Sequence, residues 1–283
     1  MNGIGLALSG GGTLGFAHVG VLKALEEAHV PIAAISGTSA GSMVAAIYAC
    51  GMRAAEMESV AYTFRTSYFD IDYWGIVKAL FSRKKDLLGF LKGDRLQQWV
   101  RDLCGNRMLA EAEMPCALIA TDLTCAEEVV FTTRPFTQPR HLTAKQIIED
   151  APIDVAVRAS IAFPGAFQPV RRGNDLLVDG GLLNDLPVNV LHAYGCTITV
   201  GINLGYEGTP RPLNNLWDIA NQSINTMIYN LEMDRAKRAT VILDIQGTTQ
   251  RWDQAGIRQN IQAGYDATLR WLDRIDMLLK ANA

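Results

Sequence analysis

The sequence predicts an α/β fold in which helices cover the faces of a parallel sheet. Two observations at the start of the chain lead to this prediction. An apolar run at 4–8 precedes a helical pattern at about 13–28, and a second apolar run at 32–36 precedes a helical pattern at 42–50. Strands that alternate with helices in this way pair in parallel, because each helix carries the chain back across the sheet.

Length and composition agree with one globular domain over residues 1–283. The chain is 49% hydrophobic and 19% charged, with a net charge of −3. These values indicate a packed core and no general attraction to nucleic acid. Because the five cysteines are scattered without a CxxC pair, we expect no disulfide framework, no metal and no cofactor. A reducing compartment such as the cytoplasm fits this pattern.

Two uncharged segments resemble targeting signals only in their hydropathy. Residues 1–22 lack a basic start and contain several glycines, so we do not expect a signal peptide. Residues 30–52 are long enough to span a bilayer. However, Pro31, Gly37 and Gly41 interrupt them, and a buried strand–turn–helix explains the segment better.

The middle of the chain predicts a helical insert at about 54–108, with Arg83-Lys84-Lys85 at its centre. Its aromatic residues look exposed: Phe64, Tyr68, Phe69, Tyr73, Trp74, Phe81 and Phe90. The insert is interpreted either as a lid or peripheral membrane contact, or as ordinary helices on the edge of the sheet.

The remaining patterns extend the alternation of strands and helices to the end of the chain. A mainly helical region is expected from about 213 to 283. The predicted elements are strands at 116–120 and 128–132, helices at 143–150 and 154–162, a hairpin of 168–171 with 176–178, a strand at 197–202, a helix at 213–238, a strand at 241–245 and a helix at 257–280.

A candidate nucleophile lies between the second strand and the second helix. The sequence Gly37-Thr38-Ser39-Ala40-Gly41 matches GxSxG. In this motif a sharp turn holds the serine in a strained backbone conformation, and the flanking glycines remove side chains that would clash. The helix that follows would place its N-terminus near Ser39, where it favours negative charge. An ordinary turn with a capping serine is the alternative.

A glycine run follows the first strand. Gly10, Gly11 and Gly12 expose backbone N–H groups, which can form an anion-binding nest. In a parallel sheet this run and Ser39 share the carboxyl edge, so the run is a candidate oxyanion hole. Gly10-x-Gly12-x-x-Gly15 also matches a dinucleotide fingerprint. That motif needs an acidic residue after the second strand, and none occurs between Pro31 and Arg53.

The general base has two candidates. Asp179 ends an apolar strand and precedes Gly180-Gly181. Apolar surroundings would raise its pKa and make it a stronger base, although Asp-Gly is also a common turn. His192 follows Asp179 in the Ser–Asp–His order of α/β-hydrolases, within a short predicted helix whose packing is the alternative. His18, His29 and His141 fit core or surface positions.

Together these motifs resemble the patatin-like phospholipase family. The resemblance rests on the glycine run, GTSAG and Asp179-Gly180-Gly181. It extends to the blocks at 15–22, 120–123, 158–164 and 184–187, and covers about residues 3–203. It implies a three-layer α/β/α sandwich, a Ser39–Asp179 dyad without a catalytic histidine, an oxyanion hole at Gly10–Gly12, and acyl lipid substrates hydrolysed without calcium.

One position departs from the family pattern. Leu14 stands where the family usually carries Arg or Lys. Loss of this cation predicts weaker electrostatic support for an oxyanion or a lipid head group, and a preference for neutral or short acyl esters. A weakly active or non-catalytic lipid-binding protein on the same fold is the alternative, as is a hydrolase that depends on His192.

Overall fold

The computed structural model describes residues 1–81, 87–204 and 213–282. Its strands are β1 (Ile4–Leu8), β2 (Ile32–Thr38), β3 (Gly89–Leu91), β4 (Cys116–Asp122), β5 (Glu127–Thr132), β6 (Gln146–Ile148), β7 (Gly165–Phe167), β8 (Val170–Arg172), β9 (Asp175–Asp179), β10 (Thr199–Asn203) and β11 (Val241–Asp244). Its α-helices are α1 (Phe16–Glu27), α2 (Ala40–Ala49), α3 (Ala54–Ala61), α4 (Tyr73–Phe81), α5 (Asp94–Leu103), α6 (Ile153–Ser160), α7 (Gly181–Asn184), α8 (Val188–Tyr194), α9 (Leu216–Ala236), α10 (Gln254–Leu269) and α11 (Leu272–Ala281).

The central sheet is mostly parallel, as predicted. Its main order is β11-β10-β1-β2-β4-β5-β6. The strands from β11 to β4 run parallel to one another, whereas β5 and β9 both pair antiparallel with β4. The hairpin predicted before Asp179 is formed by β8 and β9. β3 and β7 make a separate small parallel pair.

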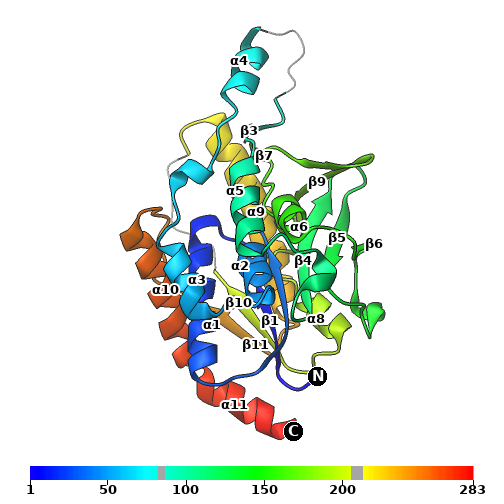
Figure 1. Ribbon diagram of the computed structural model, residues 1–283, viewed down its shortest axis with the longest axis vertical. Helices are drawn as coiled ribbons and strands as arrows, with labels where there is room; N and C mark the ends of the chain where they lie inside the picture. The colour runs from blue at the N-terminus through cyan, green and yellow to red at the C-terminus, as the bar shows by residue number, and fades with distance from the viewer. Residues whose placement is uncertain (82–86, 205–212, 283) are drawn as a thin grey trace.

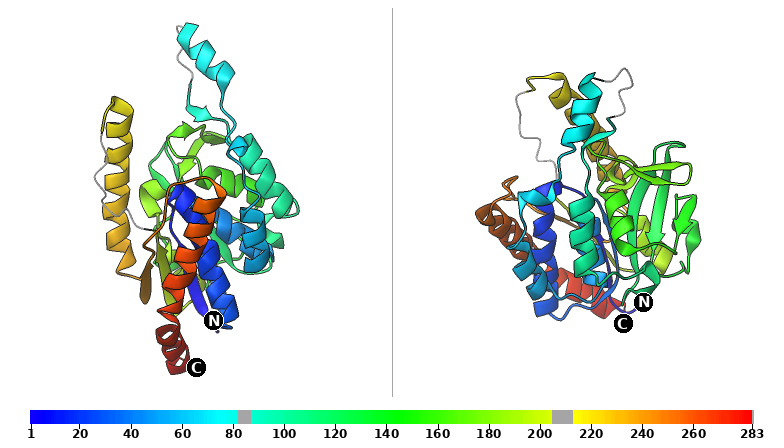
Figure 2. Two further views of the ribbon diagram at one scale, coloured as in Figure 1. Left: turned by 90° about the vertical axis from the view of Figure 1, so that its left-hand side faces the viewer. Right: turned by 45° about the horizontal axis from the view of Figure 1, so that its top comes forward.

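Helices cover both faces of this sheet and produce three layers (Figures 1 and 2). α1, α2, α6 and α10 lie on one face, and α7, α8 and α9 lie on the other. Alternating strand residues supply the two cores. In β1, for example, Leu6 and Leu8 face the first layer, while Ala7 faces the second. The expected three-layer α/β/α fold is therefore confirmed.

The register of three neighbouring strands positions the candidate dyad. Thr38, next to Ser39, pairs with Ile119 of β4. The next β4 residue, Ala120, pairs with Asp179 of β9. Because β5 pairs with residues 117–122 of β4, β2 and β9 both lie along the opposite edge of β4, one after the other. β9 runs antiparallel to β4, so its end meets the end of β2 on that edge and brings Asp179 next to the turn that carries Ser39.

Three predicted helices differ from the observed ones. The helix predicted at 143–150 is wrong, because this segment contains β6, where Ile147 and Ile148 pair with β5. Pairing with a neighbouring strand here overrides the local helical pattern. The closing helix at 257–280 is two helices, α10 and α11. The first predicted helix starts with a 3-10 turn, η1 (Gly12–Gly15), before α1.

The 54–108 insert is only partly exposed, contrary to the expectation from its aromatic residues. Phe64 is buried and meets the rings of Phe16, Trp99 and Trp252. By contrast, α4 projects from the body of the molecule (Figure 1), and Trp74 on it is 82% exposed. The side chain of Phe81 and the cluster Arg83-Lys84-Lys85 lie outside the described residues.

The C-terminal region completes the same sheet and its helical layer. β11 pairs with β10 at the end of the sheet. α10 packs closely on α1, where Gly20 and Gly264 leave no room for a Cβ atom. None of the described helices combines the length and the apolar character that crossing a membrane requires.

Candidate active site

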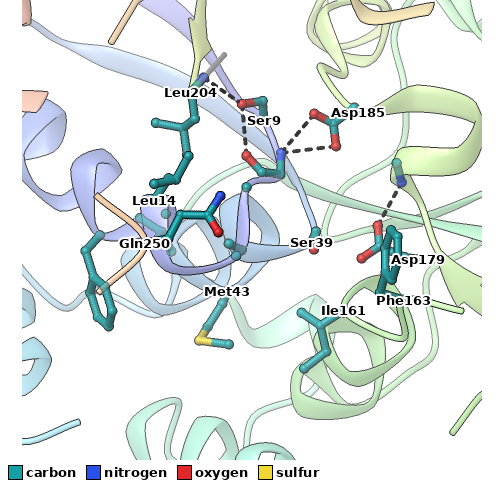
Figure 3. Close-up of a pocket in the computed structure, with 18 of the residues that line it drawn as sticks. Ser9, Leu14, Ser39, Met43, Ile161, Phe163, Asp179, Asp185, Leu204 and Gln250 are labelled. Carbon is teal, nitrogen blue, oxygen red and sulfur yellow. Dashed lines mark hydrogen bonds between the residues drawn. The ribbon is translucent and has the colours of Figure 1, made fainter. Parts of the chain in front are cut away.

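A cavity of about 750 Å³ opens where β1, β2 and β10 end. Ser39, Asp179 and the glycines at 10–12 all line it. The turns that follow parallel strands meet at this edge of the sheet, which is where α/β proteins bind ligands. The structure therefore brings the predicted nucleophile, base and oxyanion loop into one cavity (Figure 3).

Ser39 occupies a sharp turn between β2 and α2. Its φ is 52° and its ψ is −123°, which is uncommon for a residue other than glycine. Its carbonyl oxygen accepts the N–H of Ser42 at 2.9 Å and the Ser42 hydroxyl at 2.6 Å. The strained backbone is thus held by the helix that follows, as the GxSxG motif requires.

Both glycines of the motif are required by close packing. A Cβ on Gly41 would lie 2.6 Å from the carbonyl oxygen of Ser9, and a Cβ on Gly37 would lie 2.7 Å from the amide nitrogen of Ser42. Nearby, a Cβ on Gly15 would lie 2.5 Å from Cβ of Ala40. The glycine run and the nucleophile turn are therefore in direct contact, with no space for side chains between them.

Asp179 is a buried carboxylate at the end of β9. Its Oδ1 accepts the N–H of Gly181 at 2.8 Å, whereas Oδ2 has no hydrogen-bond partner among the described residues. Burial raises the pKa of Asp179 to about 6, while the Gly181 hydrogen bond and the Ser39 hydroxyl act in the opposite direction. A carboxylate with this pKa holds a proton more strongly than a solvated aspartate, and it is still ionised near neutral pH.

Gly180, which follows Asp179, packs directly against the backbone of β4. A Cβ on Gly180 would lie 2.6 Å from the carbonyl carbon of Ile119. The Thr38 hydroxyl donates to the carbonyl oxygen of Asn184 at 2.7 Å. This hydrogen bond connects the strand before Ser39 to α7, which begins two residues after Asp179.

Among the described residues, one amide of the Gly10–Gly12 run is hydrogen-bonded and the other two have no partner. The Gly10 N–H donates to the carboxylate of Asp185, with 3.2 Å to each oxygen. Gly11 and Gly12, at φ of 140° and 57°, have amides without a partner among the described residues. Of the predicted oxyanion donors, these two can receive a ligand, whereas Gly10 is already engaged.

The histidines lie elsewhere. His192 does not line the cavity, and its Nδ1 and Nε2 lie 3.2 Å and 3.1 Å from the carbonyl oxygens of Cys196 and Arg238. His18 is buried, and its Nε2 lies 2.9 Å from the carbonyl oxygen of Ser9. Burial lowers the pKa of His18 to about 4, so its ring is neutral near pH 7. The sequence-based role of His192 as base therefore has no geometric support.

Three residues in the cavity wall or directly behind Ser39 were not identified from the sequence. Ser160 accepts the Ser39 N–H through its hydroxyl at 3.0 Å. Asp185, which is partly buried, and Glu232, which is buried, are carboxylates in the cavity wall. The first two fall within the blocks that carry the family resemblance, at 158–164 and 184–187. Glu232 lies in α9, where no sequence motif marks it.

The lining of the cavity has an apolar part and a polar part. Leu14 lines it, at the position where the resemblance leads one to expect a cation. The apolar part includes Phe16, Met43, Val44, Phe64, Phe69, Leu96, Trp99, Ile161, Phe163, Phe167, Leu204, Ile228 and Trp252. The polar part includes Ser9, Asp185, Asn221, Asn225, Tyr229, Glu232, Thr248, Thr249 and Gln250. Among the described residues, no group of His, Cys, Asp and Glu side chains is arranged to hold a metal ion.

Comparison with known proteins gives a consistent result. Residues 6–192 match the family model described as patatin-like phospholipase. The chain is 31% identical over 213 residues to an uncharacterized NTE family protein of Mycobacterium tuberculosis, covering 73% of this chain and 51% of the relative. It is 27% identical over 208 residues to patatin-like phospholipase domain-containing protein 6 of Mus musculus, covering 73% of this chain and 14% of the relative.

The chain thus spans about half the length of the mycobacterial relative and a smaller part of the mouse protein. Its fold is similar to the crystal structure of VipD from Legionella pneumophila, with a TM-score of 0.53 and 17% identity over 97% of this chain and 67% of the other. The family model covers about two thirds of the chain, including the segments that carry Gly10–Gly12, Ser39, Asp179 and Asp185, whereas the cavity residues of α9 and of 248–252 lie beyond it. The protein therefore belongs to the patatin-like phospholipase family.

Proposed function

We propose that the protein is a serine hydrolase that cleaves carboxylic acyl esters of lipids, with Ser39 as nucleophile and Asp179 as base. Membership of the patatin-like phospholipase family implies lipid acyl hydrolase activity. The observation that carries the finer assignment is the shared cavity: a serine in a strained strand-to-helix turn and a buried carboxylate of raised pKa line the same space. This combination supports direct activation of a serine by a carboxylate.

The reaction then proceeds through an acyl-enzyme. Asp179 takes the proton from Ser39 Oγ as this atom attacks the ester carbonyl, and the N–H groups of Gly11 and Gly12 stabilise the oxyanion. The proton passes from Asp179 to the departing alkoxide, which leaves as the alcohol. Water then loses a proton to Asp179 as it attacks the acyl group. Collapse of this intermediate releases the acid, and the proton returns to Ser39.

The cavity lining supports an acyl lipid substrate. Its aromatic part offers an apolar surface for an acyl chain, and a volume of about 750 Å³ suits a lipid-sized ligand. Leu14 provides no positive charge near the oxyanion loop. We therefore expect neutral or short acyl esters to be preferred over anionic phospholipids.

The helical insert supports contact with a membrane surface. On α4, Tyr73 is 68% exposed and Trp74 is 82% exposed, and the helix projects from the body of the molecule (Figures 1 and 2). Residues 54–108 would then act as a lid-like part of a single domain that guides lipid to the cavity. Exposed aromatic residues favour the membrane interface because one part of the ring is apolar and another is polar.

The test combines fluorophosphonate labelling with hydrolysis of p-nitrophenyl esters. Wild type is expected to be labelled and to turn over. Ser39→Ala should lose both properties, and Asp179→Asn should lose hydrolysis while it keeps its fold. His192→Gln should hydrolyse like wild type and serves as the matched control.

A protein that is neither labelled nor active on any ester would support the alternative, a non-catalytic lipid-binding role. The feature that favours this alternative is Leu14, because it removes the expected cation from the cavity. The Leu14→Lys variant distinguishes the active hydrolase from the non-catalytic lipid-binding protein in a second way. In an active enzyme it should raise hydrolysis of anionic phospholipid relative to neutral ester.

A further inference from the structure

Asp185 contacts both halves of the proposed active site, although the mechanism above assigns it no step. It caps the C-terminal end of α7, the short helix that follows Asp179. Both of its oxygens lie 3.2 Å from the amide nitrogen of Gly10, and the carboxylate faces the cavity (Figure 3). One side chain from the segment after Asp179 therefore reaches the loop that follows β1.

The space around Asp185 is tightly filled. A Cβ on Gly10 would lie 2.5 Å from Asp185 Oδ1 and 3.2 Å from Cβ of Ser39. A Cβ on Gly181 would lie 2.9 Å from the same Asp185 oxygen and 3.2 Å from Asp179 Oδ1. Asp185 is thus close to the nucleophile turn through Gly10 and close to Asp179 through Gly181.

We infer that Asp185 is a positioning residue for the oxyanion loop: its carboxylate oxygens hold the Gly10 amide, so that the amides of Gly11 and Gly12 stay free and directed to the cavity. This inference rests on the proposed function. A hydrogen bond to the Gly10 N–H fixes the orientation of the Ser9–Gly10 peptide plane, and it thereby restricts the conformations open to the glycines that follow. Preorganised donors stabilise an oxyanion because they need no rearrangement in the transition state.

The charges near Asp185 explain why an acceptor, and not a negative charge, is the important property. Burial, and then repulsion by Asp179, raises the pKa of Asp185 to about 7. Glu232 on α9 lines the same cavity, and burial, followed by repulsion from Asp185 and Asp244, raises the pKa of Glu232 to about 9. Near neutral pH, the pair of Asp185 and Glu232 therefore retains at least one bound proton. A protonated Asp185 keeps a carbonyl oxygen that accepts the Gly10 N–H.

The acceptor role predicts that asparagine can replace Asp185 and that an apolar residue cannot. Asp185→Asn keeps an oxygen acceptor, whereas Asp185→Leu keeps the branched shape but replaces both oxygens with larger methyl groups, and Asp185→Ala removes the oxygens without adding bulk. For p-nitrophenyl butyrate we expect Asp185→Leu to lower kcat about 10- to 100-fold, with KM changed by less than about threefold. Asp185→Asn should stay within about fivefold of wild-type kcat. Asp185→Ala should behave like the leucine variant.

Two controls show whether a loss of activity comes from Asp185 itself or from a protein that no longer folds. Thermal unfolding followed by circular dichroism identifies any variant that does not fold, and either Asp185→Leu or Asp185→Ala is sufficient for the comparison with Asp185→Asn. Asp154→Asn removes a buried carboxylate that pairs with Arg101 and does not line the cavity. It should keep wild-type kcat even if it is less stable.

The outcomes are distinct. If Ser39→Ala is inactive and the leucine variant turns over like wild type, the positioning role is refuted while the proposed function stands. If Asp185→Asn is as impaired as Asp185→Leu, the negative charge matters and the acceptor role is refuted. If Ser39→Ala hydrolyses the ester normally, the proposed function itself fails, whatever the Asp185 variants do.

Discussion

Ser39 and Asp179 are held by the same short segment at the end of α6. The Ser39 N–H donates to the hydroxyl of Ser160 at 3.0 Å, and the Asp179 N–H donates to the carbonyl oxygen of Ala162 at 3.0 Å. Two residues that are far apart in the chain thus share a common support. Any shift of this segment would change the separation of the proposed nucleophile and base.

Ser160→Ala should therefore lower activity because it changes the position of Ser39 relative to Asp179, although Ser160 takes no part in the chemistry. Removal of the hydroxyl leaves the Ser39 N–H without its acceptor and should cost about 1 kcal/mol of stability. We expect kcat to fall about tenfold with little change in KM. Steady-state kinetics and a urea titration measure both effects. Ser160→Thr, which keeps the hydroxyl, is the matched variant, and equal losses in both would count against this role.

Activity should rise with pH through the titration of Asp179. A general base works only when ionised, and burial raises the pKa of Asp179 to about 6. Below that pH the carboxyl holds its proton and kcat/KM should fall. Measurement of kcat/KM between pH 4.5 and 8 with a neutral ester tests this. An acid limb near the ordinary aspartate value of about 3.9 would contradict the desolvated base.

Glu232→Gln should stabilise the protein near neutral pH. Because burial raises the folded-state pKa of Glu232 to about 9, the unfolded chain releases this proton at lower pH than the folded chain does. Folding stability is therefore lost as pH rises from the unfolded value toward 9. Glutamine removes this penalty, so we expect a gain of about 1 to 3 kcal/mol at pH 8 and almost none at pH 4.5.

Chemical denaturation of wild type and Glu232→Gln at the two pH values provides the comparison. A gain from Glu232→Gln that is equal at both pH values would mean that the carboxyl is not held protonated in the fold.

Gly41→Ala should be far more damaging than a glycine substitution at an open position. A Cβ on Gly41 would meet the backbone of Leu8 and Ser9, including a Ser9 oxygen at 2.6 Å. Gly105 has a φ of 65° and open space around its Cβ position, so Gly105→Ala should cost only about 1 kcal/mol. Thermal unfolding of the two variants tests the difference. Similar melting temperatures would show that α2 can move away from β1 at little cost.

Trp74→Ala should weaken binding to lipid vesicles without changing hydrolysis of a water-soluble ester. Trp74 is 82% exposed on the projecting helix α4. Met277 is 70% exposed on α11, at the opposite end of the molecule (Figure 1), and Met277→Ala is the control. Vesicle co-sedimentation and p-nitrophenyl butyrate turnover measure the two properties. Equal vesicle binding by both variants and wild type would argue against membrane contact through α4.

The sequence predicts the strands of the sheet well because local patterns encode them, and the two residues of the dyad that it predicts line one cavity. Apolar runs at β1 and β2, with glycines at their ends, are local features. β6 was missed because its pairing with β5 depends on distant residues, and Phe64 was placed on the surface because the rings that cover it come from separate parts of the chain. Asp185 lies within a block that resembles the family. Its hydrogen bond with Gly10 could not be predicted, because it joins two residues that are far apart in the chain.

The pairing of β2, β4 and β9 has a further consequence for how this scaffold can be altered. Thr38, Ile119, Ala120 and Asp179 stay in register through backbone hydrogen bonds, and α4 does not take part in that pairing. A library that exchanges α4 and its immediate flanks, while it retains Phe64 and Trp99 in the aromatic core, should therefore yield folded proteins with an unchanged dyad. If α4 contacts lipid as proposed, recombination could transfer that contact separately from the proposed catalytic residues.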